Sequence, residues 1–154
     1  QYKFLVVLYR ELYRREFVMA NMAAKLVSQY FESKDTKAAE LREDVLRVGW
    51  GFKGGSIEIF FAFDEEGTHV HLEGMNFIKV PQEKYDAIYK VLNECNYTYK
   101  HVKFVLDTSD GQISARDDAI IQLDTCGPEC FELMIRMVQI VEDAYPMFMK
   151  AMWV

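Results

Sequence analysis

The chain has 154 residues, of which 51% are hydrophobic and 14% aromatic, and its net charge at pH 7 is −6. This length suits one domain with a core of its own, and the apolar content argues against intrinsic disorder. The acidic balance argues against a nucleic-acid partner, which needs a basic face, and no uncharged apolar run approaches the ~20 residues that cross a bilayer.

Residues 1–17 form a predicted leader, and residues 18–154 form the predicted domain. Residues 1–16 carry a net charge of +2 (four basic against two acidic), whereas the rest of the chain carries −8 (14 against 22). The leader could dock on the acidic body or on an acidic partner, although a plain solvated segment is the preferred interpretation. It could be a strand, a helical extension, or a segment that precedes a natural start at Met19 or Met22.

Apolar residues recur at helical spacing over Val18–Phe31, which predicts a helix. The polar and charged segment Ser33–Asp44 is predicted to be a loop. Three strands are predicted to follow, at Val45–Phe52, Ser56–Phe63 and His69–Val80, joined by turns rich in glycine and acidic residues. Alternation in the second strand gives one uniformly apolar face, which consists of Ile57, Ile59, Phe61 and Phe63.

The opposite face of these strands is polar at one end and apolar at the other. The apolar end consists of Phe60, Met75 and Phe77. Such a patch needs a cover, which could be another element of this chain, a second copy or a protein client. These three residues are the predicted partner-binding site.

A second helix is predicted over Tyr85–Asn96, with Pro81 at its start and Asn96 closing it in the left-handed conformation. The period of the apolar residues then changes to two, which predicts a hairpin over His101–Asp118 with its turn at Thr108–Gly111.

This helix and hairpin contain an ordered set of short motifs that resembles the signature of the YbjN family: Leu92-Asn93, Asn96, Lys103-Phe104, Leu106-Asp107, Asp110-Gly111 and Arg116-Asp117. The order of elements extends the resemblance over residues 20–150, and residues 1–18 do not belong to it. Proteins of that family are described as bacterial sensory transduction regulators, and their fold is similar to that of type III secretion chaperones. The resemblance therefore implies a chaperone-like or regulatory role.

The last predicted helix begins at Gly127-Pro128-Glu129, and Pro146 is expected to kink or end it. The whole order is helix, three strands, helix, two strands, helix. This order predicts an α+β fold, an antiparallel sheet flanked by helices, similar to the type III secretion chaperones that the resemblance implies.

The alternative function is a metal-dependent sensor or enzyme. His69, His71 and Glu73 share one face of a strand, because residues two apart point the same way, and such side chains bind zinc. A solvated strand face explains them without a metal and is the preferred interpretation. Asp117 and Asp118 would point to opposite faces of their strand, so they do not form an acid–base pair.

The three cysteines do not suit a disulfide framework, and no signal peptide is recognisable, so a cytoplasmic location is expected. Cys126 and Cys130 lack the spacing of a redox pair. Cys130 would lie in the first turn of a helix, where the dipole can lower a thiol pKa, but a buried structural thiol is the preferred interpretation.

These patterns together predict a non-enzymatic protein-binding module that forms a homodimer, binds a protein client, or both. No catalytic, cofactor-binding or metal-binding residue is assigned, and no nucleic-acid or membrane partner is expected.

Overall fold

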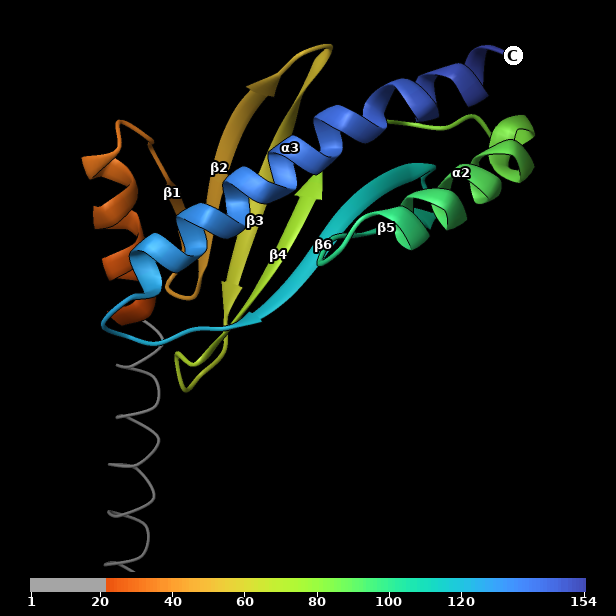
Figure 1. The fold of residues 1–154 in the computed structure, drawn as a ribbon. Helices are drawn as coiled ribbons and strands as arrows, with labels where there is room; N and C mark the ends of the chain where they lie inside the picture. The colour runs from red at the N-terminus through yellow and green to blue at the C-terminus, as the bar shows by residue number, and fades with distance from the viewer. Residues whose placement is uncertain (1–21) are drawn as a thin grey trace, which may run out of the picture.

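The computed structural model describes residues 22–154. A helix over residues 22–33 comes first and is followed by one six-stranded antiparallel sheet and two longer helices (Figure 1). The elements in chain order are β1 (Ala39–Arg42), β2 (Val45–Phe52), β3 (Gly55–Phe63), β4 (His69–Met75), η1 (Gln82–Lys84), α2 (Tyr85–Thr98), β5 (Lys103–Asp107), β6 (Gln112–Ile120) and α3 (Cys126–Trp153). The predicted α+β class is confirmed. The predicted leader lies outside the described residues.

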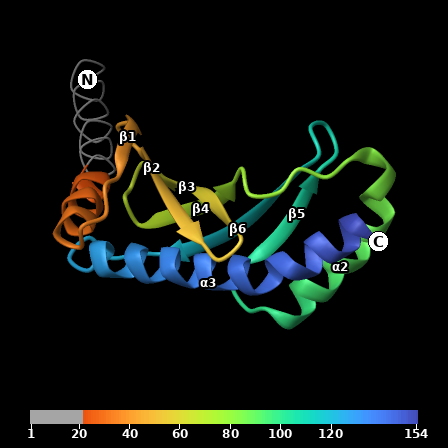
Figure 2. The same cartoon turned by 90° about the horizontal axis from the view of Figure 1, so that it is seen from above.

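The strand order is β1-β2-β3-β4-β6-β5, so β6 lies between β4 and the edge strand β5. Helices α2 and α3 lie on the same side of the sheet (Figure 2), and we call the sheet face toward α3 the inner face. The predicted apolar stripe of β3 faces inward, and all four of its residues are buried. Phe31 from the first described helix packs edge-on against Phe61 and against Phe131 of α3, so helix, sheet and helix share one core.

Strand β2 has the predicted bounds, and β3 begins one residue earlier than predicted. The predicted loop at residues 33–44 is wrong in part, because residues 39–42 form β1. This four-residue strand is mostly exposed and has no alternating pattern. It exists because its main chain pairs with β2, from Ala39 opposite Arg47 to Arg42 opposite Val45.

The third predicted strand ends early, at Met75 rather than at Val80. Asn76 has a φ of 61°, which breaks the extended chain and its alternation of faces. Pairing with β6 then resumes irregularly, since Lys79 bridges Gln112 and the N–H of Ile113 donates to the carbonyl of Ile78 (3.1 Å). The break turns Phe77 to the inner face.

Helix α2 runs two residues past the predicted end, and Asn96 is inside it rather than closing it. The Asn96 side chain instead bonds both main-chain groups of Phe104: the amide Nδ2 donates to the carbonyl (3.0 Å) and Oδ1 accepts from the N–H (2.7 Å). The hairpin begins at Lys103 rather than His101, whose φ is 71°, and it ends at Ile120 rather than Asp118.

Helix α3 continues through Pro146 to Trp153, so the proline does not end it. Phe148, two residues later, is fully buried and its ring contacts that of Phe104 (centroids 5.3 Å apart). This packing holds the turn after the proline against the core. No helix of residues 22–154 is long and apolar enough to cross a membrane.

Candidate functional site

The candidate site is the outer face of the sheet, which no helix of residues 22–154 covers (Figure 2). Because neighbouring residues of a strand point to opposite faces, the outward side chains can be assigned from the register. Those that face outward on the central strands include Arg47, Glu58, Phe60, Ala62, His71, Glu73, Met75, Arg116 and Asp118. The face therefore mixes charges with a few apolar side chains.

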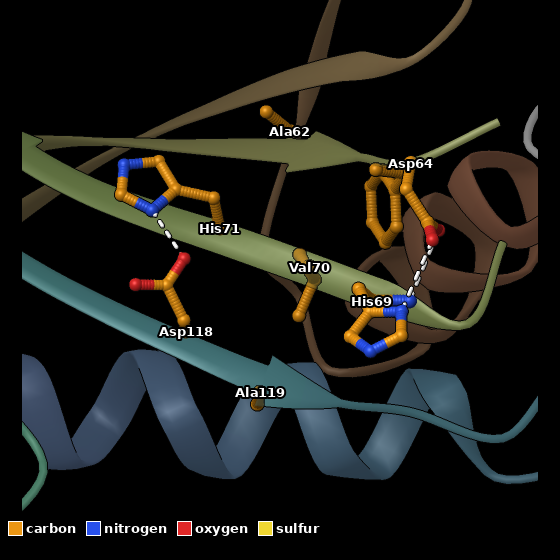
Figure 3. Close-up of a pocket in the computed structure, with 8 residues that line it drawn as sticks. Ala62, Asp64, His69, Val70, His71, Asp118 and Ala119 are labelled. Atoms are coloured by element: carbon orange, nitrogen blue, oxygen red, sulfur yellow. Dashed lines mark hydrogen bonds and ion pairs between the residues drawn. The ribbon is translucent and has the colours of Figure 1, made fainter.

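His71 is the centre of a network of polar side chains on this face. It lies opposite Asp118 in the β4–β6 register, and its Nδ1 is 2.7 Å from Oδ1 of that carboxylate (Figure 3). Its Nε2 is 3.5 Å from Oε2 of Glu73, and Oε1 of Glu73 is 3.2 Å from the guanidinium of Arg116. Exposed pairs of this kind contribute about 0–1 kcal/mol each to stability. Their main effect is to fix a defined pattern of charge on the surface.

The predicted apolar patch is only partly found on this face. Phe60 and Met75 lie there, both half-buried, with the Arg47–Glu58 ion pair (3.8 Å) beside them. Phe77 does not, because it is 8% exposed and its ring packs against that of Phe104 (centroids 6.5 Å apart). The alternation predicted for this strand runs through Asn76, whose φ of 61° reverses it.

The predicted histidine site does not assemble into a metal centre. His69 and His71 both line a depression of about 280 Å³ (Figure 3), but each has its own carboxylate. Nδ1 of His69 is 3.1 Å from Oδ2 of Asp64, and Asp64 also accepts from the N–H groups of Thr68 (2.9 Å) and His69 (3.0 Å). Among the residues that the structure describes, no group of three or more His, Cys, Asp or Glu side chains is placed to hold a metal ion.

Hydrogen bonds within the β3–β4 turn stabilise the ionised carboxylate of Asp64. Burial acts to raise the pKa of its carboxyl, but the hydrogen bonds from His69 and Thr68 together lower the pKa below its ordinary value. Asp64 therefore ties the β3–β4 turn together. We assign it a structural role.

Asp117 and Asp118 point to opposite faces, as the alternation predicts. Asp118 is exposed beside His71, whereas Asp117 is 6% exposed and its Oδ2 has no hydrogen-bond partner in residues 22–154. Burial raises the pKa of Asp117, although Arg136, His101 and the N–H of Asp118 act in the opposite direction. A buried carboxylate with an unpaired oxygen costs stability, which marks this end of β6 as a place where stability has not been optimised.

Replacing Asp117 by Asn should therefore stabilise the fold at neutral pH. Since the folded-state pKa is raised, the penalty of the carboxylate is absent below the unfolded-state pKa and appears as pH rises through the folded-state pKa. The gain in free energy of unfolding, on the order of 1 kcal/mol, should vanish at acidic pH. Urea unfolding of both proteins across a pH series measures it.

The exposed Asp124 provides the control for this pH series. Asp124→Asn should show no such pH-dependent gain. A constant difference between Asp117→Asn and wild type at every pH would mean that ionisation of Asp117 is not the cause.

The three cysteines are free and buried. Burial raises the pKa of Cys95 to about 11 and raises those of Cys126 and Cys130. Cys130 does lie in the first turns of α3, but desolvation outweighs the helix dipole there. These thiols are poor nucleophiles, as a structural role requires.

The motifs behind the family resemblance build the scaffold around the outer face. Asp107 accepts hydrogen bonds from the N–H (2.9 Å) and hydroxyl (2.6 Å) of Ser109, which lowers its pKa, and Asp110 accepts from the N–H of Gln112 (2.9 Å). Gly111, with a φ of 76°, closes the turn of the hairpin. The motifs thus determine the conformation of the β5–β6 turn, and Asn96 hydrogen-bonds the main chain on the outer edge of β5.

The described residues form a small α+β domain with one helix-covered and one open, charge-patterned sheet face. The chain belongs to the YbjN family: the family model matches residues 23–149 and is described as "putative bacterial sensory transduction regulator". Among curated proteins no match was found.

Solved structures similar to this chain include the crystal structure of YbjN, "a putative transcription regulator from E. coli", which is 12% identical. The similarity has a TM-score of 0.54 and covers 77% of this chain and 87% of that one. At this identity, the similarity supports the assignment of the fold alone.

Two structures of complexes are also similar. The ExsC–ExsE complex is 16% identical with a TM-score of 0.49, covering 78% of this chain and 86% of that chain. The HopA1–SchA chaperone–effector complex is 14% identical with a TM-score of 0.47, covering 77% and 93%.

Proposed function

We propose that this protein is a non-enzymatic protein-binding module with a chaperone-like or regulatory role in the cytoplasm. Its partner surface is the outer face of the sheet around Phe60 and Met75, and its partner is a second copy, a protein client, or both. The observation that supports this most is the open outer face. A six-stranded sheet presents this whole face without a helix over it in residues 22–154.

The chemistry of the face suits a protein partner. Phe60 and Met75 offer apolar contact, and charges of both signs surround them within the cross-strand pairs. An interface of this kind gains its energy at the apolar centre and its specificity from the charged rim. Phe77 contributes indirectly, since it supports the segment that follows Met75 from inside the core.

The family description supports a regulatory role, because a regulator works by contacting another molecule. The side chains on the face support a binding role better than a catalytic one. The two histidines of the depression are paired with carboxylates, and the three thiols are buried.

The test is Phe60→Lys, measured by light scattering over a concentration series and by quantitative co-purification with tagged full-length protein. A lysine at position 60 would lie opposite Glu73 on β4 and Arg47 on β2, and its aliphatic stem would stay on the sheet. The attraction to one and the repulsion from the other offset each other, so the fold should survive within about 1 kcal/mol. Self-association or client recovery should fall about tenfold, since truncating a central apolar contact costs more than 1 kcal/mol.

Ser56→Lys is the matched control, because Ser56 is exposed at the far end of the same strand. It should leave binding unchanged. If Phe60→Lys associates and recovers clients like wild type, the outer face is not the partner surface.

A further inference from the structure

The C-terminal end of β6 is paired with β4 but extends beyond the end of β5, its neighbour on the other side. β4 pairs with β6 as far as His69 opposite Ile120, whereas β5 pairs with it only as far as Lys103 opposite Arg116. Figure 2 shows β6 continuing past β5 toward the first turns of α3. Within residues 22–154, no strand lies on the β5 side of residues 117–120.

The main chain of this overhang can accept a strand. The N–H of Ile121 donates to the carbonyl of Thr68 (2.8 Å), which continues the register with β4. Successive residues of an antiparallel strand direct their N–H and C=O groups to opposite sides. The main-chain groups of Asp118 and Ile120 therefore face away from β4, toward the side where β5 has ended.

On β5, which forms the same edge of the sheet, the outward main-chain groups of Phe104 already have hydrogen-bond partners. There the outward N–H and C=O of Phe104 are both bonded by the side chain of Asn96. An amide that mimics a strand in this way blocks pairing with another chain. No equivalent side chain bonds the main chain of Ile120 in residues 22–154.

A small groove lies beside the overhang, between β6 and α3. It has a volume of about 210 Å³ and is lined by Ala119, Ile120, Glu129, Glu132, Leu133 and Arg136. Ligand pockets usually have about 300–1,000 Å³, so this groove fits a side chain or two rather than a small molecule. Half-buried Leu133 provides its apolar floor, and Ile120, which is 78% exposed, lies at its rim.

The charge around the groove is acidic. Arg136 is the one cation among the residues that line the groove, and it already pairs with Glu132 (3.0 Å). Glu129 adds a second carboxylate at the rim, where it also accepts from the N–H of Gln122 (3.0 Å) and the hydroxyl of Thr125 (2.6 Å). Asp118 does not face the groove, since it points to the outer face and pairs with His71. A partner segment with basic side chains complements this surface.

We propose that an extended basic segment of a protein partner adds as a strand to β6 at Asp118–Ile120 and places an apolar side chain in the groove against Leu133. Main-chain hydrogen bonds supply affinity, and the groove and its carboxylates select the sequence. The inference deepens the proposed function and rests on it. It concerns a surface separate from Phe60 and Met75, so each can fail alone.

The probe is a fluorescent octapeptide of alternating lysine and valine, titrated into the full chain and followed by anisotropy. One comparison peptide has glutamate in place of lysine, and another has a central proline that cannot pair. The lysine peptide should bind and protect the amide of Ile120 from hydrogen exchange, and added salt should weaken it. Equal affinity for all three peptides, or no binding by any, overturns the inference.

Two variants locate the site. Ile120→Pro removes an N–H that no β4 residue uses, so it should weaken the lysine peptide about tenfold. Ile120→Thr keeps that N–H and the β-branched shape, and its affinity should stay within about threefold of wild type. Wild-type affinity in a folded Ile120→Pro protein contradicts strand addition here.

Glu132→Lys keeps the test decisive if the proline variant fails to fold. Glu132 is exposed on α3, so this change should leave the fold intact and shift preference from the lysine peptide toward the glutamate peptide. If Glu132→Lys prefers the lysine peptide as strongly as wild type does, the groove is not where the peptide binds. If the peptides fail while Phe60→Lys still disrupts association, the proposed function stands without this second site.

Discussion

Phe77→Ala is expected to destabilise the protein by about 3–5 kcal/mol, the usual cost of deleting a buried phenylalanine ring. Phe77 is inside the core and packs edge-on against Phe104, whose ring contacts that of Phe148. Removing it leaves a cavity between the segment after β4, the edge strand and α3. Chemical denaturation, with the midpoint and slope fitted separately, measures the loss.

Phe60→Ala is the matched control, since it deletes the same atoms from a half-buried position on the outer face. We expect a loss of about 1 kcal/mol there, because little cavity forms on an open surface. Equal losses at Phe60 and Phe77 would contradict the assignment of one residue to the surface and the other to the core.

Gly111→Ala is expected to cost about 3 kcal/mol, for two reasons that add. Gly111 has a φ of 76°, which a residue with a Cβ adopts at a cost of about 1–2 kcal/mol. A Cβ at this position would also lie 2.5 Å from the carbonyl oxygen of Val80. That oxygen belongs to the main chain, and the N–H of Val80 donates to the carbonyl of Gly111 (2.8 Å), so the contact cannot relax alone.

Thermal unfolding should show a decrease of roughly 6–12 °C for Gly111→Ala, from the usual relation between free energy and midpoint at this size. Gly51→Ala is the control, because a Cβ there meets nothing within 4 Å. It should change the midpoint little. A small effect at Gly111 would mean that the β5–β6 turn and the Val80 segment can separate without loss.

Local pattern was sufficient for most of the elements. Alternation in Ile57–Phe63 identified β3 and its buried face, and the same argument separated Asp117 from Asp118. Helical spacing identified α2 to within two residues and α3 at its start, whereas α3 continues beyond Pro146 to Trp153. These features depend on which way neighbouring side chains point, and that is set by the backbone of the element itself.

The candidate site was only partly predictable. The sequence placed Phe60, Met75 and His71 on the open face, but it could not pair His71 with Asp118, which is 47 residues away. That pairing requires β6 to lie beside β4, an order that the chain sequence does not state. Phe77 was misplaced because one left-handed residue, Asn76, reverses the alternation after Met75.

The sequence by itself determined the class of fold, the family, the buried faces of the strands and the charge of the body. The tertiary structure alone decided that residues 39–42 become a strand, that Asn96 closes the edge of β5, and that β6 overhangs it beside α3. The physical reason is the range of the interactions involved. Periodicity and turn chemistry act between near neighbours in the chain, whereas strand order, register and edges depend on main-chain groups brought together from distant positions.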